Sequence, residues 1–205
     1  MTDYAAIAGL GVATVHEAAG RTGIVELDLI RVVPGSRVAG PARTALCEPG
    51  DNTMVHAAVA HARPGDVLVL TSTAPAPVAL VGELLATQAQ VRGVAGLLVD
   101  GAVRDLDELV ELGLPIWTRH VRAQGATKGQ VGKLDVPVVV GGVEIRPGDL
   151  VVLDGDGALA LPADRVDEVL PLAVERLERE SAVRERYRGG ELSYDLQGLR
   201  ALVEE

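Results

Sequence analysis

The sequence predicts a single α/β domain, an α/β/α sandwich built on a mixed sheet. The chain has 205 residues, 48% of them hydrophobic, so one domain can bury a sizeable core. From residue 64 onward, short β-rich runs alternate with longer helical runs, and turn residues separate them. The later β-rich runs are joined by short turns rather than by helices, which favours a mixed sheet over a wholly parallel one.

The first predicted elements follow a turn at residues 64–66 (PGD). Residues 67–70 read as a buried strand, and residues 96–99 as the next one. Between them, residues 81–92 predict a helix ended by Gly93. The side chains expected to face the core from this helix are Leu84, Leu85, Ala89 and Val91.

The second half of the chain continues the pattern. Residues 104–112 predict a helix ended by Gly113. Three further β-rich runs and a long charged helix follow, at residues 137–140, 150–153, 158–160 and 164–188. No linker-like tract or internal repeat divides residues 1–205, so one domain is expected, with residues 189–205 as an arm that packs on a neighbour.

Composition excludes several classes of partner. The net charge of -10 and the absence of a Lys/Arg-rich run argue against nucleic-acid binding, as does the 2% aromatic content. No segment approaches the roughly 18 uninterrupted apolar residues that a membrane helix needs. The apolar run at residues 5–15 lacks a preceding basic region, so it does not resemble a secretory signal, and we expect a cytoplasmic protein.

The single cysteine, Cys47, excludes an intrachain disulfide framework and is expected to be a buried, inert thiol. The turn at residues 155–157 (GDG) superficially resembles a dinucleotide or calcium loop, but an apolar strand pattern follows it, so a hairpin is the better interpretation. The chain has no G-x-S-x-G elbow, and its four histidines show no zinc-ligand spacing.

Carboxylates gather after the strand at residues 96–99, in the segment 100–108 (DGAVRDLDE). Ligands of α/β proteins collect beyond the carboxyl ends of strands, and carboxylates with water suit Mg²⁺ or Mn²⁺. An equally weighted alternative is that Asp105 and Asp107 only interact with a helix dipole. Glu83 lies at an earlier helix start, where free backbone N–H groups can bind an anion, although it could also be a plain N-terminal acid.

Taken together, these residues resemble the class II pyruvate aldolases that share a fold with the regulator of ribonuclease activity A. The signature of that family is an acid, twenty intervening positions, Arg-Asp, two positions and a further acid; here it is Glu83, Arg104, Asp105 and Glu108. Further matches are residues 11–18 (GVATVHEA), 49–52 (PGDN), 82–87 (GELLAT) and 186–192 (RYRGGEL). The resemblance covers nearly the whole chain, and Glu83 stands where the family usually has Asp.

The resemblance implies a site. Asp105 would be the direct metal ligand, while Glu83 and Glu180 would act through metal-bound water, with Glu180 supplied by an adjacent subunit. Arg104 and the backbone at Gly82, Leu84 and Leu85 would hold the pyruvate part of the substrate. The family assembles as a homotrimer or homohexamer.

The implied reaction is retro-aldol cleavage of 4-carboxy-4-hydroxy-2-oxoadipate or 4-hydroxy-4-methyl-2-oxoglutarate, with oxaloacetate decarboxylation as a side activity. The electron sink is expected to be Mg²⁺ or Mn²⁺, because Lys128 and Lys133 lie in a glycine-rich stretch unsuited to a Schiff base. The base for the C4 hydroxyl is expected to be a metal-organised water. The competing hypothesis is a non-catalytic, ribonuclease E inhibitor-like protein, against which the acids at positions 83, 105, 108 and 180 argue.

Overall fold

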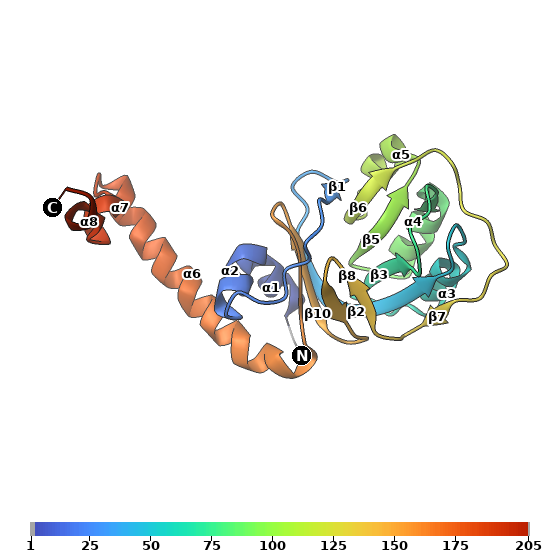
Figure 1. The fold of residues 1–205 in the computed structure, drawn as a ribbon, viewed down its shortest axis with the longest axis horizontal. Coiled ribbons are helices and arrows are strands. Elements are labelled where there is room, and N and C mark those ends of the chain that lie inside the picture. Colours follow the sequence, from blue (N-terminus) through green and yellow to red (C-terminus); the bar gives the residue numbers. More distant parts are fainter. Residues whose placement is uncertain (1–2, 205) are drawn as a thin grey trace.

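A nine-stranded mixed sheet forms the centre of the computed structural model, which describes residues 3–204 (Figure 1). Its strands follow the order β1-β6-β5-β3-β2-β10-β11, with β4 beside β5 and β7 beside β2. The strands are β1 (Ile30–Arg31), β2 (Val38–Cys47), β3 (Val67–Ser72), β4 (Ala79–Val81), β5 (Gly96–Val103), β6 (Ile116–Val121), β7 (Lys133–Leu134), β10 (Leu150–Asp154) and β11 (Gly157–Leu161). A separate two-stranded sheet pairs β8 (Val138–Val140) with β9 (Val143–Ile145).

Helices cover the sheet on two sides (Figure 1). They are α1 (Tyr4–Leu10), α2 (Val12–Ala18), α3 (Thr53–His61), α4 (Glu83–Val91), α5 (Leu106–Leu112), α6 (Val166–Arg188), α7 (Ser193–Leu196) and α8 (Leu199–Glu204), and a short 3-10 helix (Ala163–Arg165) precedes α6. Strands β2, β3, β5 and β6 run parallel, whereas β10 pairs antiparallel with β2 and with β11. The predicted α/β class with a mixed sheet is confirmed.

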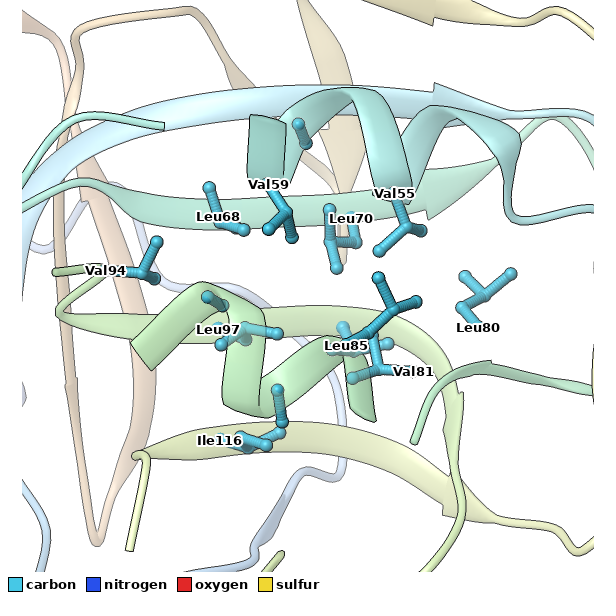
Figure 2. Close-up of a cluster of buried hydrophobic side chains, with 14 of the residues drawn as sticks. Val55, Val59, Leu68, Leu70, Leu80, Val81, Leu85, Val94, Leu97 and Ile116 are labelled. Carbon is cyan, nitrogen blue, oxygen red and sulfur yellow. The ribbon is translucent and has the colours of Figure 1, made fainter. Parts of the chain in front are cut away.

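The core consists of three clusters of buried side chains. In the first, α3, α4 and α5 pack on one face of the parallel strands, as Figure 2 shows for Val55, Leu70, Leu85 and Leu97. The second lies on the opposite face, where β8, β9, β10 and β11 fold over the sheet. The third joins α1, α2 and α6 to the outer face of β10 and β11. The mixed sheet therefore curls back on itself and is nearly closed, rather than lying flat between two helical layers.

The element boundaries around positions 81 and 104 differ from the prediction. Helix α4 begins at Glu83, because Val81 ends strand β4 and Gly82 is extended. Leu84 and Val91 are 74% and 82% exposed, so the expectation that they face the core is wrong, whereas Leu85 and Ala89 are buried. These two core residues are four positions apart on one helical face, and Leu84 points about 100° away from it.

Strand β5 continues four residues beyond the predicted end, to Val103, through an irregularity between Val99 and Ala102. Helix α5 consequently begins at Leu106 rather than at Arg104. The tight hairpin predicted at residues 155–157 joins β10 to β11 and is confirmed. Ten-residue strand β2 was not predicted, since Gly40, Pro41 and Arg43 interrupt its apolar pattern.

Helix α6 projects from the body and carries α7 and α8 at its far end (Figure 1). Its buried side chains, Val169 and Ala173, both lie in its first third, where it packs against α2. Within residues 3–204, no helix is both long and apolar enough to cross a membrane.

Candidate active site

Arg104 and Asp105 form the short connection between the end of β5 and the start of α5. The backbone N–H of Arg104 donates to the carbonyl of Val81 at 3.0 Å, which places this connection beside the start of α4. Asp105 has φ 59° and ψ 48°, a left-handed conformation that costs a non-glycine residue about 1–3 kcal/mol. Such strain concentrates at functional sites, so Asp105 is a strong candidate for a functional group.

The Asp105 carboxylate faces the neighbouring helix. Its Oδ2 accepts a hydrogen bond from the N–H of Glu83 at 3.0 Å and lies 3.5 Å from Nε of Arg104. Asp105 is the N-cap residue of α5 but makes no side-chain cap bond there. The alternative interpretation was that both acids only interact with a helix dipole. It therefore fits Asp107, in the first turn of α5, better than it fits Asp105.

Two glycines leave room for this arrangement. A Cβ atom on Gly82 would lie 2.6 Å from Oδ2 of Asp105 and 3.0 Å from Nε of Arg104. A Cβ atom on Gly125 would lie 2.5 Å from Nη1 of Arg104. The guanidinium thus occupies space that any larger residue at either position would take.

A cavity of about 260 Å³ opens over these groups. It is lined by Asn52, His56, Ala79, Leu80, Gly82, Leu84, Leu85, Gln88, Arg104, Asp105, Gly125, Ala126 and Lys128. The structure therefore brings together Gly82, Leu84, Leu85, Arg104 and Asp105, five of the residues singled out from the sequence. By helix geometry the N–H groups of Leu84 and Leu85 have no partner inside α4, so they are available to an anionic ligand.

Other predicted residues lie elsewhere. The Glu83 side chain is half-buried outside the cavity lining, and its Oε1 accepts a hydrogen bond from Oγ1 of Thr87 at 2.7 Å. Asp100 pairs with Arg119 at 3.1 Å instead of joining Asp105. Glu108 is exposed on α5.

Glu180 lies on the projecting part of α6, far from α4 and α5 within one chain (Figure 1). Its Oε1 is 2.8 Å from Nε of Arg176, the four-residue pairing that the sequence allows. A role for Glu180 in a neighbouring subunit's site stays a prediction.

The cavity is also lined by Asn52, His56 and Lys128, which were not predicted as site residues from the sequence. The available signal was the match at residues 49–52, which contains Asn52. Burial lowers the pKa of His56, and the charge of Lys128 lowers it further, whereas the charge of Asp51 has a smaller, opposite effect. The imidazole is therefore mainly neutral at pH 7.

The oxygen donors at this site fit a hard divalent cation. Mg²⁺ is commonly held by one or two protein carboxylates while it keeps several water ligands. Asp105 supplies one half-exposed carboxylate, and residues 3–204 contain no group of three or more His, Cys, Asp or Glu side chains arranged to hold a metal. Asp105 could therefore contribute a single carboxylate ligand, with water in the other coordination positions.

The fold is that of the RraA-like family. The family model described as RraA-like: Aldolase/RraA matches residues 12–160, and the chain belongs to this family. It is 37% identical over 127 residues to the 4-hydroxy-4-methyl-2-oxoglutarate aldolase of Thermus thermophilus, covering 62% of this chain and 77% of the relative. A protein of Halalkalibacterium halodurans, whose name assigns it provisionally to the same activity, is 36% identical over 168 residues (82% and 78% coverage).

Solved structures of the same family are also similar. Streptomyces coelicolor RraAS2, described as an unusual member of the RNase ES inhibitor RraA family, matches with TM-score 0.79 and 32% identity, covering 88% of this chain and 94% of that one. The RNA-processing inhibitor RraA of Thermus thermophilus matches with TM-score 0.62 and 33% identity, covering 69% and 84%. The family thus includes both aldolases and RNA-processing inhibitors.

Proposed function

We propose that this protein is a divalent-metal-dependent aldolase that releases pyruvate from a tertiary aldol. One observation carries the proposal: Arg104, strained Asp105 and the free amides at the start of α4 line a single cavity. The aldolase names of the curated relatives support the same class of lyase. We further propose 4-carboxy-4-hydroxy-2-oxoadipate or 4-hydroxy-4-methyl-2-oxoglutarate as the substrate.

The cavity residues at the starts of α4 and α5 have roles in this reaction. The N–H groups of Leu84 and Leu85 bind the C1 carboxylate, and Gly82 allows its close approach. The Arg104 guanidinium donates to the C2 carbonyl oxygen, where negative charge develops. Asp105 would hold Mg²⁺ or Mn²⁺, and Glu83 and a neighbour's Glu180 would orient water; a bound cation would supply Lewis-acid stabilisation of developing negative charge.

The retro-aldol cleavage needs no oxidant or reductant. The C4 hydroxyl loses its proton to a base, C4 becomes a carbonyl and the C3–C4 bond breaks. The electron pair of the C3–C4 bond passes to the C2 oxygen, and C3 then takes up a proton to give pyruvate. The second product is oxaloacetate or pyruvate, according to the substrate, and the same stabilisation would permit oxaloacetate decarboxylation.

The decisive experiment measures pyruvate release with and without divalent metal. Excess chelator should abolish release, and Mg²⁺ or Mn²⁺ should restore it, because the proposed electron sink is the cation. Lys128 lines the cavity, so borohydride trapping in the presence of substrate is a necessary companion measurement. Full activity in chelator would show that the cation is not the electron sink, and inactivation by borohydride would show that a Schiff base operates instead.

The second candidate function is inhibition of an RNA-processing enzyme, because solved relatives of the family are described as such inhibitors. It predicts inhibition of a ribonuclease E-type enzyme that persists in the Asp105→Ala variant, together with no pyruvate release. For either function we propose a homotrimer or homohexamer.

A further inference from the structure

The cavity holds a second set of polar groups that the reaction described above does not use. Asn52 is the N-cap residue of α3, His56 lies one turn further along that helix, and Lys128 comes from a loop. Each lines the same cavity as Arg104 and Asp105.

The orientation of the Asn52 amide is fixed. Its Nδ2 donates to the backbone carbonyl of Leu80 at 2.9 Å, and only the nitrogen of an amide can make that bond. The Oδ1 atom is buried and has no hydrogen-bond partner in the part of the chain that the structure describes. A buried acceptor without a partner is unfavourable, so it calls for a donor from a ligand or water.

His56 presents a similar group. Its Nε2 is buried and unpartnered among residues 3–204. Lys128 is exposed and forms no ion pair with any described residue. The cavity thus combines an unused hydrogen-bond acceptor, an unused imidazole nitrogen and an unpaired cation.

A rigid scaffold holds the three groups together. Buried Asp51 accepts hydrogen bonds from the N–H of Thr53 at 2.8 Å and the N–H of Gln130 at 3.2 Å. The N–H of Asn52 donates to Thr127 O at 3.0 Å, and the N–H of Gly129 donates to Oγ1 of Thr53 at 2.9 Å. The loop carrying Lys128 is therefore fastened to the start of α3.

We infer that Asn52, His56 and Lys128 bind the groups on carbon 4 of the substrate. Asn52 Oδ1 accepts a hydrogen bond from the C4 hydroxyl, while Lys128 and His56 Nε2–H bind a carboxylate on the same carbon. The inference rests on the proposed function and deepens it, since it assigns the preference for a 4-carboxylated tertiary aldol to named residues.

Complementarity of charge and hydrogen bonding supports this assignment. A hydroxyl is the ligand donor that an isolated amide oxygen requires, and an ammonium suits a carboxylate. Arg104 and Lys128 place two cations in one cavity of a chain whose net charge is -10, which matches a substrate with carboxylates at both ends.

The test compares two substrates, 4-hydroxy-4-methyl-2-oxoglutarate and 4-hydroxy-2-oxopentanoate, the second of which has no C4 carboxylate. In Lys128→Met and His56→Leu, kcat/KM for the carboxylated substrate should fall about 10–100-fold, as expected for loss of a hydrogen bond to a charged group. The ratio of the two kcat/KM values should fall at least about tenfold. Matched controls are Lys133→Met and His61→Leu, exposed residues outside the cavity, with the histidine on the same helix.

Proton exchange at C3 of pyruvate, followed by NMR in D₂O, distinguishes a failure of the inference from a failure of the proposed function. Wild-type exchange and cleavage with an unchanged substrate ratio in both variants would overturn the inference alone. An equal fall for both substrates would also overturn it, because it would indicate a general structural effect. If the wild type neither exchanges pyruvate protons nor cleaves either substrate with metal present, the proposed function and the inference fail together.

Discussion

At the residue scale, the most informative position is Asp105, whose side chain caps α4 from a strained backbone at the start of α5. A residue that only stabilised its own helix would need neither the left-handed conformation nor the contact with the N–H of Glu83. The same carboxylate lies beside the Arg104 guanidinium, so local geometry fixes two functional groups of opposite charge together.

We expect Arg104→Lys to lower kcat by about 10²–10³, the usual effect of losing a strong transition-state donor. Lysine keeps the charge but cannot present two parallel N–H groups to substrate oxygens. Steady-state kinetics of the purified variant provides the measurement, with Arg122→Lys as the control, because that exposed arginine lies outside the cavity lining and its side chain donates to the backbone carbonyl of Val121. A rate within a factor of roughly two of wild type would exclude the proposed role of Arg104.

Gly125→Ala should reduce activity with little loss of stability. The new methyl group would meet Nη1 of Arg104, the far end of a flexible side chain, which can move away without disturbing the core. We expect kcat/KM to fall about tenfold or more, in line with displacement of a substrate-positioning group. Kinetics and thermal denaturation should be compared with those of Gly9→Ala, whose added Cβ meets no atom within 4 Å. A fall in Tm matching the loss of activity would contradict this explanation.

At the scale of elements, the start of α3 organises one wall of the cavity. Asp51 is buried, yet its hydrogen bonds from Thr53, Gln130 and Thr127 outweigh desolvation and lower its pKa. The strand-to-helix turn and the loop at residues 125–130 thereby behave as one unit. Cys47, at the end of β2, shows the opposite effect: burial raises the pKa of its thiol to about 11, and the expectation that this cysteine is buried is confirmed.

Asp51→Ala should lower Tm by on the order of 5 °C at pH 7, since the partly buried hydrogen bonds from Thr53, Gln130 and Thr127 are lost. Because the folded-state pKa is below the unfolded one, the stabilisation is present above about pH 4 and is lost as the pH falls through the folded pKa. The difference in Tm between wild type and variant should therefore shrink on acidification. Asp28→Ala, an exposed acid outside the helices, provides the control. A pH-independent difference would contradict the role assigned to the Asp51 carboxylate.

At the scale of the whole molecule, the projecting helix α6 has a surface that packing within one chain does not account for. Beyond its first third the helix buries no side chain, and exposed apolar residues continue to its end and beyond, among them Tyr187, Leu192, Leu202 and Val203. Such a surface is typical of a segment that packs against another subunit.

We predict that Glu180 completes the site of a neighbouring subunit. Asp105→Ala and Glu180→Ala should each be nearly inactive, but unfolding, mixing and refolding them should restore part of the wild-type activity, because some sites then contain both residues. Each variant refolded alone is the control. If mixed oligomers are verified by mass and remain inactive, Glu180 either serves its own chain or has no catalytic role.

The sequence by itself determined the α/β class, most of the strands and helices after residue 64, and the gathering of Gly82, Leu84, Leu85, Arg104 and Asp105. Local patterns were sufficient there, because turn residues and apolar periodicity act over a few positions and the family signature spans the same segments. The boundaries at Val81 and Val103 were less accurate: Val81, assigned to the helix, pairs with Val103, and this pairing between β4 and β5 extends β5 past its predicted end.

Only the tertiary structure decided the curling of the sheet, the separation of Asp100 from Asp105 and the second wall of the cavity. Asn52 and Lys128 are 76 positions apart in the chain, and they line one cavity because the buried Asp51 carboxylate bonds a loop distant in sequence. No local pattern encodes that contact. It depends on long-range hydrogen bonds whose partners become neighbours only after the sheet has formed.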